Sequence, residues 1–308
     1  MTELSILILT KNGGDDFRAC LAQVYAQSVI GQAEVIVVDS GSNDDTVPFA
    51  RSLGARVVQI APQSFHHART RNFAASMAQG QILVLLSQDA IPASNQWLEA
   101  LTANFKDPAV GAVYGKQFPK EGASLERKDV LDTVYGDHRI IKDPAHRNVL
   151  GYRFYHFSDV NSAIRRSVWE STRFPEDLRV FEDLGIAKRI LDAGWKIIYE
   201  PGASVFHSHH HTTVGLFKRY FDIGYTLKRL QIWDSPGTQS SLLKDGLVLL
   251  RNKLRRITGK RAQASASGFG QDIAKSAGLF LGLNQHRLPH ALKRHFSAND
   301  IYRQIAKN

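Results

Sequence analysis

Short apolar runs alternate with helix-like segments through the first 90 residues, and this alternation constrains the fold more than any other feature. Each apolar run is rich in β-branched residues or leucine, as buried parallel strands are. In chain order we expect strand 5–9, helix 15–27, strand 34–38, helix 44–53, strand 56–60, helix 67–78 and strand 82–86. Repeated strand–helix–strand units predict an α/β fold with a mostly parallel central sheet flanked by helices. Ligands of such sheets bind beyond the carboxyl ends of the strands.

The pattern changes twice further along the chain. Between residues 110 and 167 it is less regular, and it then predicts helices near 166–171 and 182–193 and a short strand at 196–199. Beyond residue 213 the sequence is helical, with an apolar stripe at steps of four and three residues from Leu243 to Ile257. Residues 261–270 are small and polar and predict a linker. We therefore expect one domain over 1–212 and a helical C-terminal region over 213–308.

The excess of positive over negative charge lies in that C-terminal region. Residues 213–308 hold 17 Lys or Arg and 5 Asp or Glu, a net charge of +12, whereas the whole chain carries +10. A basic segment on a near-neutral body indicates an anionic partner, such as a membrane surface, a phosphorylated lipid or nucleic acid.

Composition limits the class of protein and the cellular compartment in which it works. The hydrophobic content of 43% is ordinary for a globular protein, and the sequence shows neither a signal-peptide pattern nor an apolar run of membrane-spanning length. Cys20 is the sole cysteine, which excludes an intramolecular disulfide and a cysteine-based zinc site. We expect a cytoplasmic location.

Polar residues follow the first two expected strands. The first strand leads into Thr10 and Asn12, and the second ends at Asp39 in an Asp-Ser-Gly-Ser-Asn-Asp-Asp-Thr run. An acidic residue here can suggest a dinucleotide fold, but the glycine fingerprint of that fold is missing, which disfavours NAD. Asp39 can instead accept a hydrogen bond from a ring N–H of a pyrimidine. The alternative is a turn and a helix cap, since Asp44 is suited to capping the next helix.

Several such motifs, in order, resemble family 2 glycosyltransferases with the GT-A fold. The resemblance covers about residues 4–210 and rests on the Thr-x-Asn strand end, the run at 37–46, Ala-Arg-Thr-Arg-Asn at 68–72, Ser-Gln-Asp-Ala at 87–90 and Phe-Glu-Asp at 181–183. Within the family the chain is similar to bacterial rhamnosyltransferases that use dTDP-β-L-rhamnose. The resemblance implies a nucleotide-sugar half at 1–110, an acceptor half at 111–212 and inverting transfer. It implies donor contacts from Thr10, Asn12, Asp39, Ser42, Arg69, Arg71, Gln88, Asp89 and Glu182.

The metal motif of the family is incomplete here. Its Asp-x-Asp pattern aligns with Ser87, Gln88 and Asp89, so one carboxylate is left. A departing nucleoside diphosphate requires charge neutralisation, and Mg²⁺ or Mn²⁺ can bind with one or two protein ligands, phosphate oxygens and water. His207 stands where some relatives carry a metal-binding histidine, and His209 would share its face in an extended strand. The alternatives are a turn at Asp89 and a polar histidine loop; a zinc-hydrolase motif is absent.

The resemblance assigns catalysis to Asp183. An inverting transfer needs a carboxylate that deprotonates the acceptor hydroxyl, and Glu182-Asp183 matches the acidic pair of the family. Otherwise the pair merely complements a helix dipole. Arg69 and Arg71 can reach a diphosphate or form surface ion pairs. We expect Asp39, Asp89 and Asp183 to converge on one cleft.

The remaining expectations concern partners. The donor is a dTDP-sugar, with a UDP-sugar as the alternative, and the acceptor is a glycan or polyprenyl-linked glycan of cell-surface polysaccharide or lipopolysaccharide. The basic tail indicates peripheral attachment to the inner face of the cell membrane, or packing on the catalytic domain or in a homo-oligomer. Nucleic-acid binding is disfavoured because no recognition motif accompanies the charge. The rival functions are a sugar nucleotidyltransferase, for which a triphosphate loop is lacking, and a non-catalytic scaffold.

Overall fold

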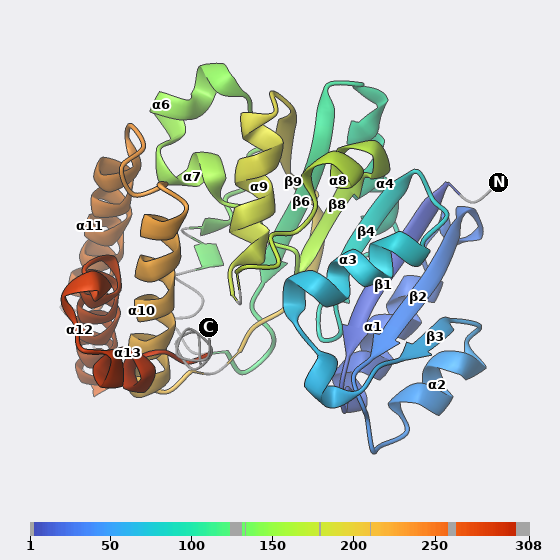
Figure 1. The fold of residues 1–308 in the computed structure, drawn as a ribbon, viewed down its shortest axis with the longest axis horizontal. Coiled ribbons are helices and arrows are strands. Elements are labelled where there is room, and N and C mark those ends of the chain that lie inside the picture. The colour runs from blue at the N-terminus through green and yellow to red at the C-terminus, as the bar shows by residue number, and fades with distance from the viewer. Residues whose placement is uncertain are drawn as a thin grey trace.

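A nine-stranded mixed sheet organises the residues that the computed structural model describes, which are 3–123, 131–132, 134–178, 180–209, 211–257 and 263–299 (Figure 1). The sheet order is β3-β2-β1-β4-β8-β6-β9-β5, with β7 also paired to β9. Strands β1 to β4 pair in parallel, and β8 runs antiparallel between β4 and β6. The strands are β1 Leu4–Thr10, β2 Ala33–Asp39, β3 Arg56–Gln59, β4 Ile82–Ser87, β5 Ile91–Pro92, β6 Val110–Phe118, β7 Ile140–Lys142, β8 Asn161–Arg165 and β9 Lys196–Phe206.

Helices cover both faces of the sheet. Side chains alternate along each strand, so Ile6 and Ile8 of β1 pack on one face and Leu7 on the other. Helices α1 and α4 cover the first face, and α3, α8 and α9 cover the second. Their bounds are α1 Gly14–Tyr25, α2 Thr46–Ser52, α3 His67–Met77, α4 Trp97–Thr102, α6 Arg147–Leu150, α7 Tyr152–Tyr155, α8 Arg166–Thr172 and α9 Glu182–Asp192. The expected α/β fold is confirmed, with element ends shifted by a few residues.

The expected short strand at 196–199 is longer than its sequence suggested. β9 continues to Phe206 by pairing with β6 across two register shifts and by pairing antiparallel with β5, where Ile91 faces Phe206. The local sequence pattern therefore predicted too short a strand, because pairing with distant segments extends it. It also brings the residue after Phe206 close to the residues just before Ile91.

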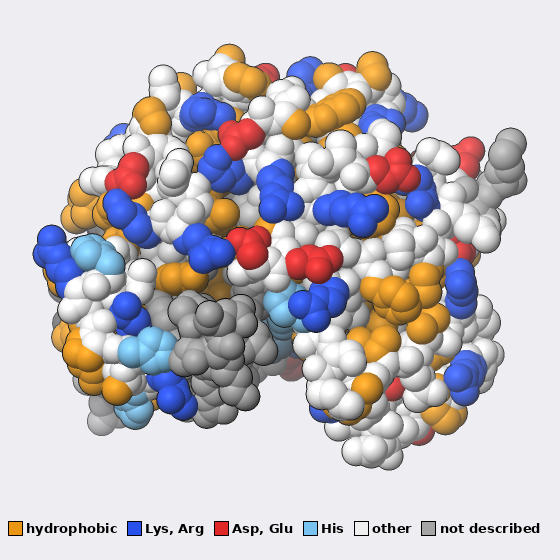
Figure 2. Space-filling model, viewed as in Figure 1, with side chains coloured by type: hydrophobic (Ala, Val, Ile, Leu, Met, Phe, Trp, Pro, Cys, Tyr) orange, Lys and Arg blue, Asp and Glu red, His pale blue; other side chains and the backbone are white. Residues whose placement is uncertain are grey.

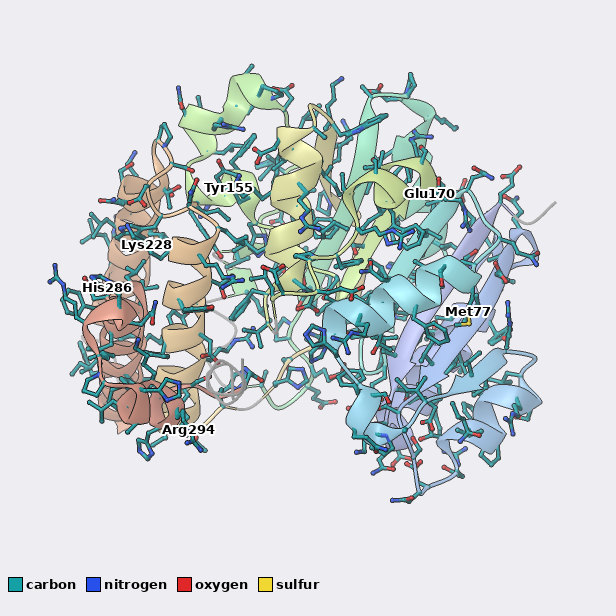
Figure 3. The ribbon with its side chains drawn as sticks, in the orientation of Figure 1. Met77, Tyr155, Glu170, Lys228, His286 and Arg294 are labelled. Atoms are coloured by element: carbon teal, nitrogen blue, oxygen red, sulfur yellow. The ribbon has the colours of Figure 1, made fainter. Side chains whose placement is uncertain are left out.

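Four helices complete the described chain: α10 Thr213–Arg229, α11 Thr238–Ile257, α12 Gln263–Leu283 and α13 His290–Phe296. They stack beside the sheet domain and share its core through Leu227 of α10, Leu283 of α12 and Ile232 between α10 and α11. Tyr155 of α7 bonds to Ser235 ahead of α11 (Oη–Oγ 3.2 Å), and Figure 3 shows His286 and Arg294 at the outer end of this helical region. No described helix has the length and apolar character needed to cross a bilayer.

The linker predicted over 261–270 is wrong from Gln263 onward, because α12 begins there. Two glycines further along this helix serve close packing. A Cβ built on Gly278 or Gly282 would lie 2.3 Å from Phe217 O or 2.1 Å from Phe221 O. The backbones of α10 and α12 thus approach closely, as small residues allow.

Candidate active site

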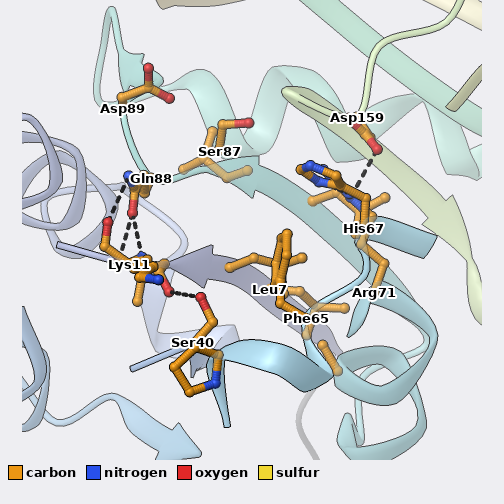
Figure 4. Close-up of a pocket in the computed structure, with 16 residues that line it drawn as sticks. Leu7, Lys11, Ser40, Phe65, His67, Arg71, Ser87, Gln88, Asp89 and Asp159 are labelled. Atoms are coloured by element: carbon orange, nitrogen blue, oxygen red, sulfur yellow. Dashed lines mark hydrogen bonds and ion pairs between the residues drawn. The ribbon is translucent and has the colours of Figure 1, made fainter. Parts of the chain in front are cut away.

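A cavity of about 290 Å³ opens beyond the carboxyl ends of β1 and β4 (Figure 4). Apolar side chains of Leu7, Leu9, Leu85 and Phe65 form part of its wall. The polar part includes Thr10, Ser40, Arg71, Gln88, Asp89 and Asp159. Four predicted donor contacts, Thr10, Arg71, Gln88 and Asp89, are therefore among the residues that line this cavity.

Asp39 shapes the turn at one side of the cavity. Its Oδ2 accepts hydrogen bonds from the backbone N–H groups of Gly41 and Ser42, each at 3.1 Å, and its Oδ1 accepts from the Ser42 hydroxyl. The Ser42 hydroxyl in turn accepts from the backbone N–H of Asn12 at 2.8 Å. Asp39 is fully buried, and its neighbour Ser40 reaches the cavity. The structure thus brings Asn12, Asp39 and Ser42 together, although none of the three lines the cavity.

Gln88 joins the ends of β1 and β4. Its Oε1 accepts a hydrogen bond from the Thr10 hydroxyl at 2.7 Å and from the backbone N–H of Lys11 at 2.9 Å (Figure 4). Because both strands are parallel, their ends meet at one edge of the sheet. Gln88 holds these two ends in register beside Asp89.

Asp89 lies beside two histidines that follow β9. Its Oδ2 is 3.5 Å from Nε2 of His207 and 3.5 Å from Nε2 of His209, and the two Nε2 atoms are 3.0 Å apart. The extended pairing of β5 with β9 produces this meeting of residues more than 100 positions apart. The cluster can hold a divalent cation. One carboxylate and two imidazoles fit Mn²⁺ better than Mg²⁺, which favours oxygen ligands alone.

A second charged cluster forms another side of the site. The Arg71 guanidinium lies 2.8 Å from Asp159 through Nε and donates to Glu182 at 2.6 Å through Nη1. All three side chains are buried. Arg71 and Glu182 therefore tie α3 to α9, and Asp159, which the sequence interpretation missed, completes the cluster. Asp159 stands two residues before β8, and the irregular pattern over 110–167 gave no signal for its role.

Asp183 lies next to this cluster at the start of α9. Its Oδ1 accepts a hydrogen bond from the backbone N–H of Leu184 at 2.8 Å. Burial raises the pKa of Asp183 well above its usual value, and the charges of Asp159 and Glu182 add to the effect. Burial also raises the pKa of Asp159 to about 6, against the lowering effect of Arg71. A carboxyl with a raised pKa is suited to accepting a proton near neutral pH.

Arg69 lies apart from the other predicted contacts. Its side chain is 63% exposed, and its Nε is 3.6 Å from Glu176 at the surface. It is not among the residues that line the cavity. Its predicted contact with the donor stays a prediction.

Comparison with known proteins assigns the chain to a family. Residues 5–172 match Glycosyl transferase family 2. The chain belongs to this family. The O-antigen chain rhamnosyltransferases RfbN of Salmonella typhimurium (strain LT2) and WbaN of Salmonella anatum are each 34% identical to it. The alignment with RfbN covers 72% of this chain and 71% of the relative, and that with WbaN covers 73% and 72%.

The fold has a solved counterpart. The mannosyltransferase PcManGT from Pyrobaculum calidifontis, solved with GDP-Man and Mn²⁺, superimposes with a TM-score of 0.60 at 18% identity, covering 90% of this chain and 87% of that structure. The family 2 protein described here is thus a glycosyltransferase with the GT-A fold.

Proposed function

We propose that this family 2 glycosyltransferase transfers L-rhamnose, with inversion, from dTDP-β-L-rhamnose to a glycan of a cell-surface polysaccharide or lipopolysaccharide. The 34% identity with two O-antigen chain rhamnosyltransferases carries the proposal. The cavity at the strand ends supports it, because it lies where α/β sheets bind nucleotide ligands.

The nucleotide-sugar half, residues 1–110, supplies most of the contacts that bind the donor. The turn organised by Asp39 and Ser42 holds the base. Oδ1 of Asp39 accepts one turn contact and keeps a lone pair for the ring N–H, whereas Oδ2 already accepts two. Thr10 and Gln88 border the phosphates, with Asp89, His207 and His209 as the residues that would hold Mn²⁺ or Mg²⁺. When bound, such a cation neutralises charge on the departing diphosphate.

Asp183 supplies the proton transfer. The acceptor hydroxyl gives its proton to the Asp183 carboxylate while its oxygen bonds to the anomeric carbon. The bond from that carbon to the diphosphate oxygen breaks on the opposite face, which inverts the configuration. Arg71 and Glu182 hold the start of α9 against α3, and so position Asp183.

The test is a donor panel. The protein is incubated with a polyprenyl-linked glycan acceptor and dTDP-rhamnose, UDP-glucose or GDP-mannose, and acceptor-dependent nucleotide release is measured with and without Mn²⁺. We expect release from dTDP-rhamnose to exceed the others by at least about tenfold, since recognition of sugar hydroxyls discriminates strongly. Preference for a UDP-sugar would overturn the donor assignment, and no release from any donor would favour the non-catalytic scaffold.

The C-terminal helices place the enzyme at its acceptor. Leu243 and Leu247 of α11 and Ile273 and Phe280 of α12 are 64–70% exposed. Basic and histidine side chains lie beside apolar ones over α12 and α13 in Figure 2. Exposed apolar groups on a strongly basic region are suited to the interface of an anionic bilayer. We include peripheral attachment to the cytoplasmic membrane face in the proposal.

A further inference from the structure

The buried amide of Gln117, near the end of β6, faces His207 from the side opposite Asp89. Its Oε1 lies 3.0 Å from Nδ1 of His207. Its Nε2 lies 2.6 Å from the Tyr135 hydroxyl and 2.9 Å from the Ser158 hydroxyl. Strands β6 and β9 run side by side up to this point, and the backbone N–H of His207 donates to Phe118 O at 2.9 Å (Figure 1).

These contacts determine the protonation pattern of the imidazole. An amide nitrogen only donates and an amide oxygen only accepts. With Nε2 of Gln117 directed at two hydroxyl oxygens, Oε1 is the atom that meets Nδ1 of His207, so Nδ1 carries the hydrogen. A neutral imidazole has one N–H, and Nε2 of His207 therefore keeps its lone pair toward Asp89 and His209.

The opposite amide orientation would oppose cation binding. The NH₂ group would then face Nδ1 of His207, the hydrogen of the ring would move to Nε2, and an N–H would point into the cluster. In the structure the amide nitrogen donates to the Tyr135 and Ser158 hydroxyls instead, which leaves Oε1 to face His207. Ser158 directly precedes Asp159, so one segment supports both charged clusters of the site.

We propose that Gln117 is a positioning residue that holds His207 in its Nδ1–H tautomer and so prepares Nε2 of His207 to bind a divalent cation. The inference rests on the proposed metal role of the Asp89, His207 and His209 cluster. Residues that orient metal-binding histidines typically contribute about 10- to 100-fold to metal affinity.

Calorimetric titration of Mn²⁺ into the full chain, without donor, tests the proposal. We expect Gln117→Met, which keeps the length but removes the acceptor, to weaken Mn²⁺ binding about 10- to 100-fold. Gln117→Glu keeps an acceptor oxygen against Nδ1, so its affinity should stay close to that of the wild type. Gln27→Met is the matched control, because among the described residues the buried Gln27 side chain bonds to backbone groups of Gln23, Ser94 and Leu98 and not to the cluster.

Nitrogen NMR of the histidine rings gives a readout that a merely structural role would not move. In the wild type without metal, the His207 signals, assigned with His207→Ala, should show the Nδ1–H tautomer, and this result does not depend on any Gln117 variant folding. An Nε2–H tautomer, wild-type affinity in Gln117→Met, or equal losses in the Met and Glu variants would each overturn the inference. Absence of Mn²⁺ binding by the wild type would instead overturn the metal part of the proposed function, and this inference with it.

Discussion

Asp183 is surrounded by groups that oppose its ionisation, and this setting explains how a carboxyl can take a proton from an alcohol. Burial and the neighbouring carboxylates of Asp159 and Glu182 raise its pKa, and a raised pKa makes its carboxylate a stronger base. Arg71 keeps the cluster from accumulating uncompensated charge, because it pairs with both neighbours.

Asp183→Asn should lower kcat by about 10²- to 10⁴-fold while leaving donor affinity nearly unchanged, because the amide keeps the shape but cannot accept the proton. Turnover and calorimetric donor binding check this expectation. Asp192→Asn, on the same helix but in an exposed ion pair with Lys188, is the control. Near-wild-type turnover by Asp183→Asn would remove it from the mechanism.

Asp159→Asn should move the acidic limb of the kcat–pH profile to lower pH. Asp183 acts as a base only above its pKa, and the charge of Asp159 raises that pKa. Removing the charge lowers the pKa, so the base stays ionised to lower pH; release of Arg71 from its pair acts in the same direction. The midpoint of the limb is measured, with Asp177→Asn, in a surface pair with Arg229, as the control. A shift to higher pH would contradict the assignment.

At this scale the sequence predicted residues that belong to local motifs. Asp39, Gln88, Asp89 and Asp183 stand at strand ends or a helix start, where neighbouring residues reveal the motif. The partners of Arg71 could not be predicted, because Asp159 and Glu182 lie 88 and 111 positions away. Such ion pairs depend on how α3 and α9 pack, which no local pattern encodes.

At the scale of elements, the contact between α10 and α12 is set by the absence of side chains. Gly224, Gly278 and Gly282 let the two backbones meet, since a Cβ on any of them would fall within 2.1–2.4 Å of a carbonyl oxygen of the other helix. The linker prediction over 261–270 rested on a neighbouring run of small and polar residues with Gly268 and Gly270, and not on these three glycines. A small residue serves a turn and a close helix contact equally well, and the contact is visible only once the partner helix is placed.

Gly282→Ala should destabilise the fold by about 1–3 kcal/mol, because the added methyl collides with Phe221 O and forces the helices apart. Gly246→Ala in α11 is the matched control, since a Cβ there meets nothing within 4 Å. That change should stabilise by about 0.5–1 kcal/mol through helix propensity. Urea unfolding of both variants measures the difference, and equal effects would disprove the close contact.

The exposed face of α11 gives a prediction about the membrane. Leu243→Ser combined with Leu247→Ser should weaken binding to vesicles containing anionic phospholipid by about tenfold or more, since burying one leucine is worth about 1.5–3 kcal/mol. Val149→Ser, at an exposed site on α6, is the control and should bind like the wild type. Co-sedimentation at low and high salt measures binding, which salt should weaken. Equal binding by all three proteins would exclude this face, and a change in oligomeric state alone would indicate a homo-oligomer contact.

At the scale of the whole molecule, the candidate site joins segments from both halves of the sheet domain. The 1–110 half contributes Thr10, Gln88 and Asp89, and the 111–212 half contributes Asp159, Asp183 and His207. Of the three carboxylates expected to converge, Asp89 lines the cavity. Asp39 is adjacent in sequence to Ser40, which lines it, and Asp183 interacts electrostatically with Asp159, which also lines it. The fold class followed from the strand–helix alternation because that pattern is local. The meeting of His207 with Asp89 was expected from the family resemblance alone, because no local pattern encodes the pairing of β5 with the unpredicted end of β9 that brings them together.

This arrangement predicts that nucleotide and metal stabilise the protein together. If Asp89, His207 and His209 hold a cation that also binds the diphosphate, dTDP at about 100 times its Kd should add about 2.7 kcal/mol of stability in Mn²⁺. A chain of this size should then show a Tm rise of roughly 4 °C. Chelation with EDTA should remove most of the rise, and re-added Mn²⁺ should restore it more fully than Mg²⁺, because two of the three ligand atoms are imidazole nitrogens. In His207→Ala, the Tm rise caused by dTDP should be as small with Mn²⁺ present as it is in the wild type with EDTA. A rise that survives both chelation and His207→Ala would mean that dTDP is held by the Asp39 turn and its neighbours alone, with the histidine cluster outside the nucleotide site.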